Sequence, residues 1–296
     1  MRLEREDLPA GAQQTSDEHS HPAGDHRLWS ESWYFDFARF DGTCGGYFRL
    51  SVQPNDGTAW LWAVVQLPDA DGPRVVFEHD AEVASSDPLM LSAGGSSLVA
   101  KCLEPGRWDI EATLSTEPNL LTEVELRWDD HGPRYFYRKA ARYEQPASVA
   151  GNITSGSNTV RVVADGQRDH SWGVRDWWTV PWVWSSGSLD DSTRFNVTRL
   201  LTRRPTEPDG FILLGREIIA VQKADLAALP GPNDRYKAVI EGRPVVGTLT
   251  TMTVIEMTDG PRCSVLHRGL VCWEAGQGVG AGWTEWNLPR RSLVLS

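Results

Sequence analysis

The stretch Ser32-Trp33-Tyr34-Phe35-Asp36-Phe37-Ala38 decides the fold, because large apolar side chains recur in it at every second residue. Residues 47–52, Tyr-Phe-Arg-Leu-Ser-Val, alternate in the same way. Successive side chains of a β-strand point to opposite faces, so this period predicts strands at both places. Similar short runs continue to Trp286, separated by turn signals such as Asn55-Asp56-Gly57. Short strands between turns predict an all-β sandwich or barrel, and only residues 223–229 favour a helix.

The length and a weak internal repeat predict two β domains. The chain has 296 residues, enough for one large domain or two ordinary ones. Ser32-Trp33 is echoed by Ser171-Trp172, and Phe48-Arg49-Leu50 by Phe195-Asn196-Val197. Proline and glycine interrupt the pattern from residue 145 to residue 156. The predicted organisation is a mobile polar arm at 1–26, an N-terminal β domain at 27–145 and a C-terminal β domain at 146–296.

Composition excludes several classes of partner. The 40 acidic residues outnumber the 29 Lys and Arg residues, giving a net charge of −11, which argues against nucleic acid or an anionic membrane as the main partner. No apolar run approaches the roughly 18 residues that span a bilayer, so stable membrane insertion is not expected. The four cysteines lack CxxC spacing and the start of the chain is charged, which predicts reduced thiols and a cytoplasmic location. Fourteen tryptophans provide rigid aromatic surface for a core or an apolar pocket.

Residues 168–178, Arg-Asp-His-Ser-Trp-Gly-Val-Arg-Asp-Trp-Trp, form the densest cluster of ionisable and aromatic groups. In an extended conformation Arg168, His170 and Trp172 share one face, whereas Asp169 projects from the other. A histidine beside an indole can transfer a proton near neutral pH, and the ring can stabilise a cation by about 0.5–2 kcal/mol. The alternative is a structural network in which the arginines bind the aspartates and His170 packs in the core.

A second candidate lies at residues 276–286, where glycine recurs at every second position up to Gly282. A strand face without side chains permits close approach of another strand or of a flat ligand. Trp283 and Glu285 then share a face, and a carboxyl among indoles has its pKa raised by desolvation, as a general acid requires. The alternative is that Glu285 is an ion-pair partner on an edge strand. The pairs Trp60-x-Trp62 and Trp182-x-Trp184 either fill a core or line a pocket.

Other reaction templates are missing from the sequence. It contains no GxSxG elbow, no P-loop and no HExxH motif, so no cofactor is predicted. His19, His21 and His26 could bind a metal, but no acidic or cysteine ligand shares a regular spacing with them. A solvated polar tail is therefore the preferred interpretation, and no metal site is predicted.

The run Gly166-Gln167-Arg168-Asp169-His170-Ser171-Trp172-Gly173 resembles the D-H-x-W-G strand of the carotenoid 1,2-hydratase (hydroxyneurosporene synthase) and AttH-like superfamily. The likeness extends to Glu31-Ser32-Trp33-Tyr34, Tyr143-Glu144-Gln145-Pro146 and Gly282-Trp283-Thr284-Glu285. The resemblance implies two lipocalin-like domains with a dry pocket between them. It also implies a lipophilic ligand, because family members hydrate isolated alkenes and fungal relatives catalyse intramolecular cycloadditions.

His170 and Trp172 match the His-x-Trp pair of the hydratases. The hydratases also use a Tyr-x-Asp pair further along, with the aspartate as proton donor, but residues 194–199 read Arg-Phe-Asn-Val-Thr-Arg. Another carboxyl must then supply the proton. Glu285 is the first choice, because Arg168 and Arg175 are expected to keep Asp169 and Asp176 ionised.

We therefore predict an all-β protein of two lipocalin-like (calycin-type) domains in tandem. The expected function is cofactor-independent acid–base chemistry on a lipophilic terpenoid-, steroid- or polyketide-like substrate, by hydration, dehydration, isomerisation or cyclisation; the alternative is a non-catalytic binding or carrier protein. The predicted catalytic residues are His170, Trp172, Glu285, Asp169 and Asp176. The predicted substrate-binding residues are Arg168, Trp177, Trp178, Trp182, Trp184, Trp283 and Trp33.

Overall fold

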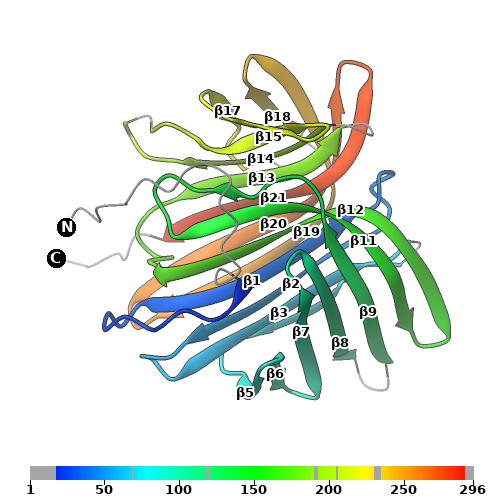
Figure 1. Cartoon of the computed structure of the whole chain (residues 1–296), viewed down its shortest axis with the longest axis vertical. Helices are drawn as coiled ribbons and strands as arrows, with labels where there is room; N and C mark the ends of the chain where they lie inside the picture. The colour runs from blue at the N-terminus through cyan, green and yellow to red at the C-terminus, as the bar shows by residue number, and fades with distance from the viewer. Residues whose placement is uncertain are drawn as a thin grey trace.

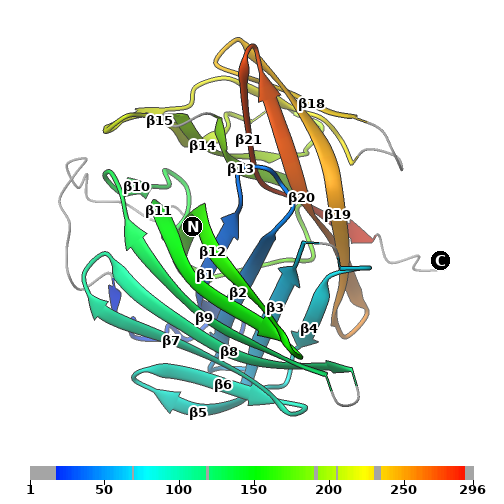
Figure 2. The same ribbon diagram turned by 90° about the vertical axis from the view of Figure 1, so that its right-hand side faces the viewer.

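The computed structural model describes residues 18–68, 70–117, 120–189, 193–204, 206–229 and 235–290. All regular elements assigned in these residues are β-strands, arranged in two curled antiparallel sheets (Figures 1 and 2). The predicted class of two lipocalin-like β domains in tandem is therefore confirmed. Residues 223–229 are not helical, because Ala224–Leu226 forms a strand that pairs with residues 238–240. No helix in the described residues has the length and hydropathy needed to cross a bilayer.

The first sheet has 12 strands within the described residues, with β1 near its centre. Its order is β4-β3-β2-β1-β12-β11-β9-β8-β7-β6-β5, and β10 pairs with β11. The strands are β1 (Trp29–Ala38), β2 (Gly45–Gln53), β3 (Thr58–Gln66), β4 (Arg74–Glu78), β5 (Glu82–Ser86), β6 (Leu89–Ala93), β7 (Ser96–Glu104), β8 (Arg107–Glu117), β9 (Leu120–Asp130), β10 (Tyr135–Phe136), β11 (Arg142–Ser155) and β12 (Asn158–Val174).

The second sheet has nine strands within the described residues, in the order β16-β15-β14-β13-β21-β20-β19-β18-β17. The strands are β13 (Trp182–Leu189), β14 (Thr193–Leu200), β15 (Asp209–Leu214), β16 (Glu217–Ala220), β17 (Ala224–Leu226), β18 (Arg235–Ile240), β19 (Arg243–Asp259), β20 (Arg262–Ala275) and β21 (Gly278–Arg290).

The two sheets share one topology. In each, the first strand pairs with the last, and the sheet is open between its fourth and fifth strands. Phe48-Arg49-Leu50 and Phe195-Asn196-Val197, which echo each other in sequence, lie on β2 and β14, the second strands of the two sheets. Ser32-Trp33 and Ser171-Trp172 do not hold equivalent places, since they lie on the neighbouring strands β1 and β12, where Ser32 pairs with Ser171. Of the two sequence similarities, only that between residues 48–50 and 195–197 therefore agrees with a repeat of the whole sheet.

Strand β1 is buried along its whole length because it is covered on both faces. Trp33, Phe35 and Phe37 point into the core of the first sheet. Tyr34 points the other way and packs with Trp184 and Trp283 of the second sheet. Burial on two sides explains why β1 carries aromatic side chains on both of its faces.

The boundary between the sheets differs from the predicted one. The predicted division between residues 145 and 146 falls inside β11, and the D-H-x-W-G motif lies on β12 of the first sheet, paired with β1 and β11. The chain passes to the second sheet between Val174 and Trp182. Proline and glycine near residue 150 misled the prediction, because Pro146 and Gly151 are accommodated within a paired strand.

The predicted mobile arm is only partly within the described residues, since residues 1–17 lie outside them. Glu18 is buried and forms ion pairs with Arg134 and Arg168 of the first sheet. The backbone N–H of His21 donates to Glu31 Oε1 at 2.9 Å, and the His21 ring stacks on Trp172. This part of the arm therefore packs against the first sheet, because Glu18 and His21 bind buried side chains of that sheet.

Candidate active site

A cavity of about 360 Å³ lies between the two sheets. Strands β1, β2, β11 and β12 of the first sheet and β13, β14, β20 and β21 of the second contribute to its wall, as does the segment joining the sheets. Its lining residues include Ser30, Ser32, Arg49, Ser51, Tyr137, Arg142, Asp169, Ser171, Arg175, Asp176, Trp177, Trp182, Trp184, Thr198, Arg268 and Glu285. Neither sheet forms this site alone.

Three of the seven predicted substrate-binding residues line this cavity: Trp177, Trp182 and Trp184. The rings of Trp177 and Trp182 contact each other at a centroid distance of 5.1 Å. The indole N–H groups of Trp182 and Trp184 donate to carboxylates, those of Glu285 at 3.0 Å and Glu144 at 3.1 Å. The indoles therefore supply apolar surface and also orient two acids.

The other predicted tryptophans lie elsewhere. Trp178 lines an adjacent cavity of about 280 Å³ together with Trp60. Trp283 is buried between the sheets, and its indole N–H donates to the Phe37 carbonyl at 3.0 Å. Trp33 belongs to the hydrophobic core of the first sheet. Trp33 and Trp283 are therefore packing residues, since their places on the strands turn them away from the cavity.

Glu285 cannot be the proton donor that the sequence suggested. Its Oε2 accepts from Arg268 Nη1 at 2.5 Å, and both side chains are buried, with 6% and 2% of their surface exposed. An adjacent guanidinium stabilises the ionised carboxylate, which opposes proton donation. The partner was not visible in the sequence near Glu285 because Arg268 lies on β20, directly opposite Glu285 in the pairing register. The glycines before it admit backbone instead of a ligand: a Cβ at Gly282 would lie 2.1 Å from the Ser186 carbonyl oxygen.

A different carboxyl pair flanks Arg142. Arg142 Nη2 contacts Asp169 Oδ2 at 2.9 Å and also Glu144 Oε1, so that two buried carboxyls share one guanidinium. Burial raises the pKa of Glu144 to about 8, against the opposing charge of Arg142. Asp169 lines the cavity, and its Oδ1 has no hydrogen-bond partner among the described residues. This cluster can hold a proton near neutral pH beside the cavity.

Tyr137 connects this cluster to the strand on which the Tyr-x-Asp pair is missing. Its hydroxyl lies on the cavity wall, 3.2 Å from Glu144 Oε1, 2.7 Å from Asn196 Oδ1 and 2.9 Å from Thr198 Oγ1. A phenol and an acid are thus present near β14, but both come from the first half of the chain. Sequence reasoning missed Tyr137 and Arg142; Glu144 stands in the Tyr143-Glu144-Gln145-Pro146 passage of the family resemblance, the one signal that could have pointed to it.

Asp176 lies where the chain leaves the first sheet. It lines the cavity but is exposed, and its carboxylate accepts from the Trp178 N–H at 3.0 Å and the Thr179 hydroxyl at 2.7 Å. Arg262 forms an ion pair with it at 3.3 Å. These contacts form the turn and engage both carboxylate oxygens, so they do not favour a catalytic role.

The predicted alternation of the D-H-x-W-G strand is present, but His170 and Trp172 do not line the cavity between the sheets. His170 is fully buried on the opposite face of β12 from Asp169, stacks on Trp33 at 4.5 Å and contacts Glu31 Oε1 through Nε2 at 3.0 Å. Burial acts to raise the pKa of Glu31, but hydrogen bonds from His170 and His21 outweigh it and hold the pKa below its ordinary value. The assignment of His170 as the cavity base is therefore corrected.

Arg168 shares this face with His170 and lies away from the cavity. Its guanidinium bonds to Asp130, Glu18 and the Tyr143 hydroxyl, so it is a paired structural cation and not a substrate-binding residue. The ligand atoms of His21, Glu31 and His170 lie within 4.8 Å of one another, a set that could hold a metal ion. The same atoms already satisfy each other by hydrogen bonds.

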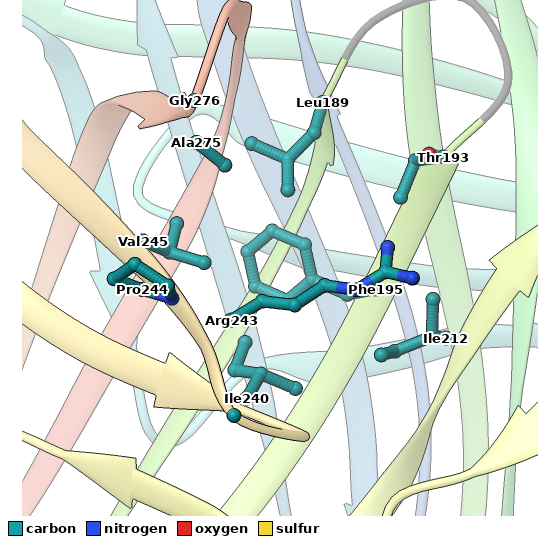
Figure 3. A pocket seen from close by; sticks show the side chains of 11 residues that line it. Leu189, Thr193, Phe195, Ile212, Ile240, Arg243, Pro244, Val245, Ala275 and Gly276 are labelled. Atoms are coloured by element: carbon teal, nitrogen blue, oxygen red, sulfur yellow. The ribbon is translucent and has the colours of Figure 1, made fainter.

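A second cavity of about 390 Å³ lies within the second sheet (Figure 3). Figure 3 shows the Phe195 ring near the centre of the view, with Leu189, Ile240 and Val245 around it and the Arg243 side chain crossing the view next to the ring. Its wall is mainly apolar, contains no carboxyl group among the described residues and includes no predicted site residue. The acids are gathered at the cavity between the sheets, which is the better candidate for chemistry.

Two curled sheets of one topology with a cavity between them define a two-domain lipocalin-like protein. Residues 14–290 match the family described as "Domain of unknown function (DUF7064)", and the chain belongs to this family. No curated protein matches the sequence.

Solved structures of three proteins share the fold. An AttH-like protein from Nitrosomonas europaea is 13% identical, with 96% of this chain and 98% of that chain covered and a TM-score of 0.70. Kievitone hydratase from Nectria haematococca is 11% identical, with coverage of 95% and 93% and a TM-score of 0.61. CghA is 12% identical, with coverage of 95% and 94% and a TM-score of 0.57. The fold that the resemblance implied, two lipocalin-like domains, is thus the fold that this chain shares with these structures.

Proposed function

We propose that this protein is an enzyme that moves protons to and from a lipophilic small molecule bound between the two sheets. The observation that carries the proposal is the pair of carboxyls, Asp169 and Glu144, sharing the single guanidinium of Arg142 at the wall of a tryptophan-lined cavity. Two carboxylates beside one cation leave a negative charge unbalanced in a buried place. Retaining a proton removes that charge, and a retained proton is what a general acid needs.

The chemistry follows from the positions of these groups. Glu144 passes its proton through the Tyr137 hydroxyl to a carbon or oxygen atom of the substrate, and Asp169 pairs with Arg142 beside it. Trp177, Trp182 and Trp184 shape the apolar wall and stabilise positive charge that develops on the substrate. In a hydration, a water oxygen then adds to the substrate, and the proton that this water loses returns to the carboxylate. In a dehydration these steps run in reverse, and in an isomerisation or cyclisation no water is added.

The fold comparison agrees with this class, since one neighbour is by name a hydratase. Another, CghA, has also been solved with the compound Sch210972. We propose a terpenoid-, steroid- or polyketide-like substrate, no cofactor and a cytoplasmic location. A non-catalytic carrier is the competing function, because an apolar cavity with three indoles can bind a lipophilic molecule without any acid.

The test begins with native mass spectrometry of the purified protein to identify any co-purified lipophilic molecule. That molecule, or an organic extract of the expressing cells, is then incubated with the wild type, Asp169→Asn and Glu144→Gln. An enzyme yields a product that has gained or lost one water, or an isomer with a new retention time, and both variants bind the molecule but form far less product. Binding with no conversion by the wild type would establish the carrier instead.

A further inference from the structure

Two arginines of the cavity wall lack a carboxylate partner. Arg49 on β2 is 5% exposed, its Nη1 donates to the Ser32 hydroxyl at 2.8 Å, and its Nε has no hydrogen-bond partner among the described residues. Arg175 donates to the Ala141 carbonyl at 2.7 Å. Within the described part of the chain, no carboxylate oxygen lies within 4.0 Å of either guanidinium. Neither guanidinium therefore forms an ion pair with a described carboxylate.

The other buried arginines show what a structural guanidinium looks like in this protein. Arg268 is paired with Glu285, Arg142 with Asp169, and Arg168 with Asp130. Each of these cations has a carboxylate at contact distance, as burial of a charge requires. The exception at Arg49 is therefore specific to its position, and it faces the cavity.

Aromatic rings surround Arg49 without neutralising it. Its Cζ lies 5.3 Å from the Tyr34 ring centroid, 5.4 Å from that of Trp62 and 5.3 Å from that of Trp177. These contacts stabilise the cation and also restrict where the guanidinium can point. Burial lowers the pKa of Arg49 and lowers that of Arg175 to about 10, and both remain protonated at neutral pH. The wall thus holds two guanidinium groups in defined positions, and neither is in contact with a described carboxylate.

We propose that Arg49 and Arg175 bind a carboxylate of the substrate, so that the molecule taken by this cavity is a lipophilic organic acid. The inference rests on the proposed function only in placing the substrate between the two sheets. Guanidinium groups with free N–H donors are suited to carboxylates, and the hydroxyls of Ser30, Ser32 and Ser51 line the same cavity. The apolar part of the acid then lies against Trp177 and the other cavity indoles.

The experiment compares 1-pyrenebutyric acid with its methyl ester, which carry the same ring system with and without the negative charge. Binding of each to the full chain is measured by pyrene fluorescence titration for the wild type, Arg49→Met and Arg175→Met. Methionine keeps much of the length of the side chain and removes the charge. We expect each variant to bind the acid about tenfold or more weakly, with the affinity for the ester unchanged.

Arg243→Met is the matched control, because Arg243 lines the cavity within the second sheet and not the cavity between the sheets. It should leave the acid-to-ester ratio unchanged. Arg49→Met should also keep or raise the melting temperature, since it removes a buried charge without a partner. If Arg49→Met does not fold, the structural role is shown for Arg49 and the acid site is overturned at that residue; the partly exposed Arg175 then tests its own half of the site.

The outcomes separate this inference from the proposed function. Equal effects on acid and ester, or no effect on either, would overturn the carboxylate site while leaving a lipophilic cavity in place. Failure of the wild type to bind either pyrene compound would count against the lipophilic cavity and against the proposed function with it. Selective loss of acid binding in both arginine variants, but not in Arg243→Met, would establish the subsite.

Discussion

The buried pair of Arg268 and Glu285 gives the sharpest test of how charge is arranged around the cavity. We predict that Glu285→Gln lowers the free energy of unfolding by about 3 kcal/mol, because it leaves the Arg268 guanidinium buried without a counter-ion. The typical cost of breaking a buried pair is about 3–5 kcal/mol. The lower end applies because Tyr34, Tyr47 and Trp184 place their ring centroids 4.4, 4.5 and 4.9 Å from Arg268 Cζ and partly stabilise the charge that remains.

Urea unfolding followed by far-UV circular dichroism and tryptophan fluorescence measures this loss. The double variant Arg268→Met/Glu285→Leu should recover to within about 1 kcal/mol of the wild type, since it removes both charges and fills the space with apolar atoms. Glu274→Gln is the matched control. Its pair with Arg235 is as short, at 2.5 Å, but both side chains are more than half exposed, so the loss should stay below about 1 kcal/mol.

A loss for Glu285→Gln as small as that for Glu274→Gln would refute the reasoning. The contact between Glu285 and Arg268 would then not stabilise the fold, and the exclusion of Glu285 as the proton donor would lose its support. A double variant as unstable as the single one would show that packing, and not charge, accounts for the loss.

Three further predictions concern pH, backbone packing and the D-H-x-W-G strand. Burial raises the pKa of Asp36 to about 7, above its unfolded value. The contribution of Asp36 to the unfolding free energy is therefore fully present below about pH 4 and is lost as the pH rises toward 7. Asp36→Asn should remove up to about 4 kcal/mol of this pH dependence, measured by urea unfolding from pH 4 to 8. An equal pH dependence in both proteins would contradict the assignment. Gly282→Ala should lower the free energy of unfolding by about 2–3 kcal/mol, because the new Cβ would lie 2.1 Å from the Ser186 carbonyl oxygen. Gly72→Ala is the control: a Cβ there would have no atom within 4 Å, so the free energy of unfolding should change by no more than about 0.5 kcal/mol. Similar thermal shifts for the two glycines would count against the close approach of β13 and β21. His170→Gln should lower the unfolding free energy by about 1–3 kcal/mol through the lost contact with Glu31 while leaving the affinity for the pyrene ester unchanged. A lower affinity of His170→Gln for the pyrene ester, with an unchanged free energy of unfolding, would indicate that His170 contributes to the cavity after all.

The sequence by itself determined the β class, the resemblance to the superfamily and the alternation of the central motif. Period-two patterning is a local property of the chain, so the strands at Trp33 and Phe48 and the opposite faces of His170 and Asp169 could be read from neighbouring residues. The helix expected at residues 223–229 failed because seven residues carry too little periodicity to outweigh the strand pairing that tertiary contacts impose.

Only the tertiary structure decided which face of each strand meets the cavity and which charges are paired. Both faces are covered along β1 and along residues 167–171 of β12, so alternation alone could not show that Asp169, and not His170, faces the cavity between the sheets. Glu285 is excluded as the proton donor because it contacts Arg268 on the neighbouring strand. Glu144 becomes the candidate acid because it contacts Arg142 and Tyr137. The strand pattern specifies none of these side-chain contacts. The same holds for Arg49. The sequence does not show whether an arginine has a carboxylate partner, and only the folded structure shows that no described carboxylate contacts Arg49. A pKa and an ion pair depend on distances in space, and those distances are set by packing between strands that lie far apart along the chain.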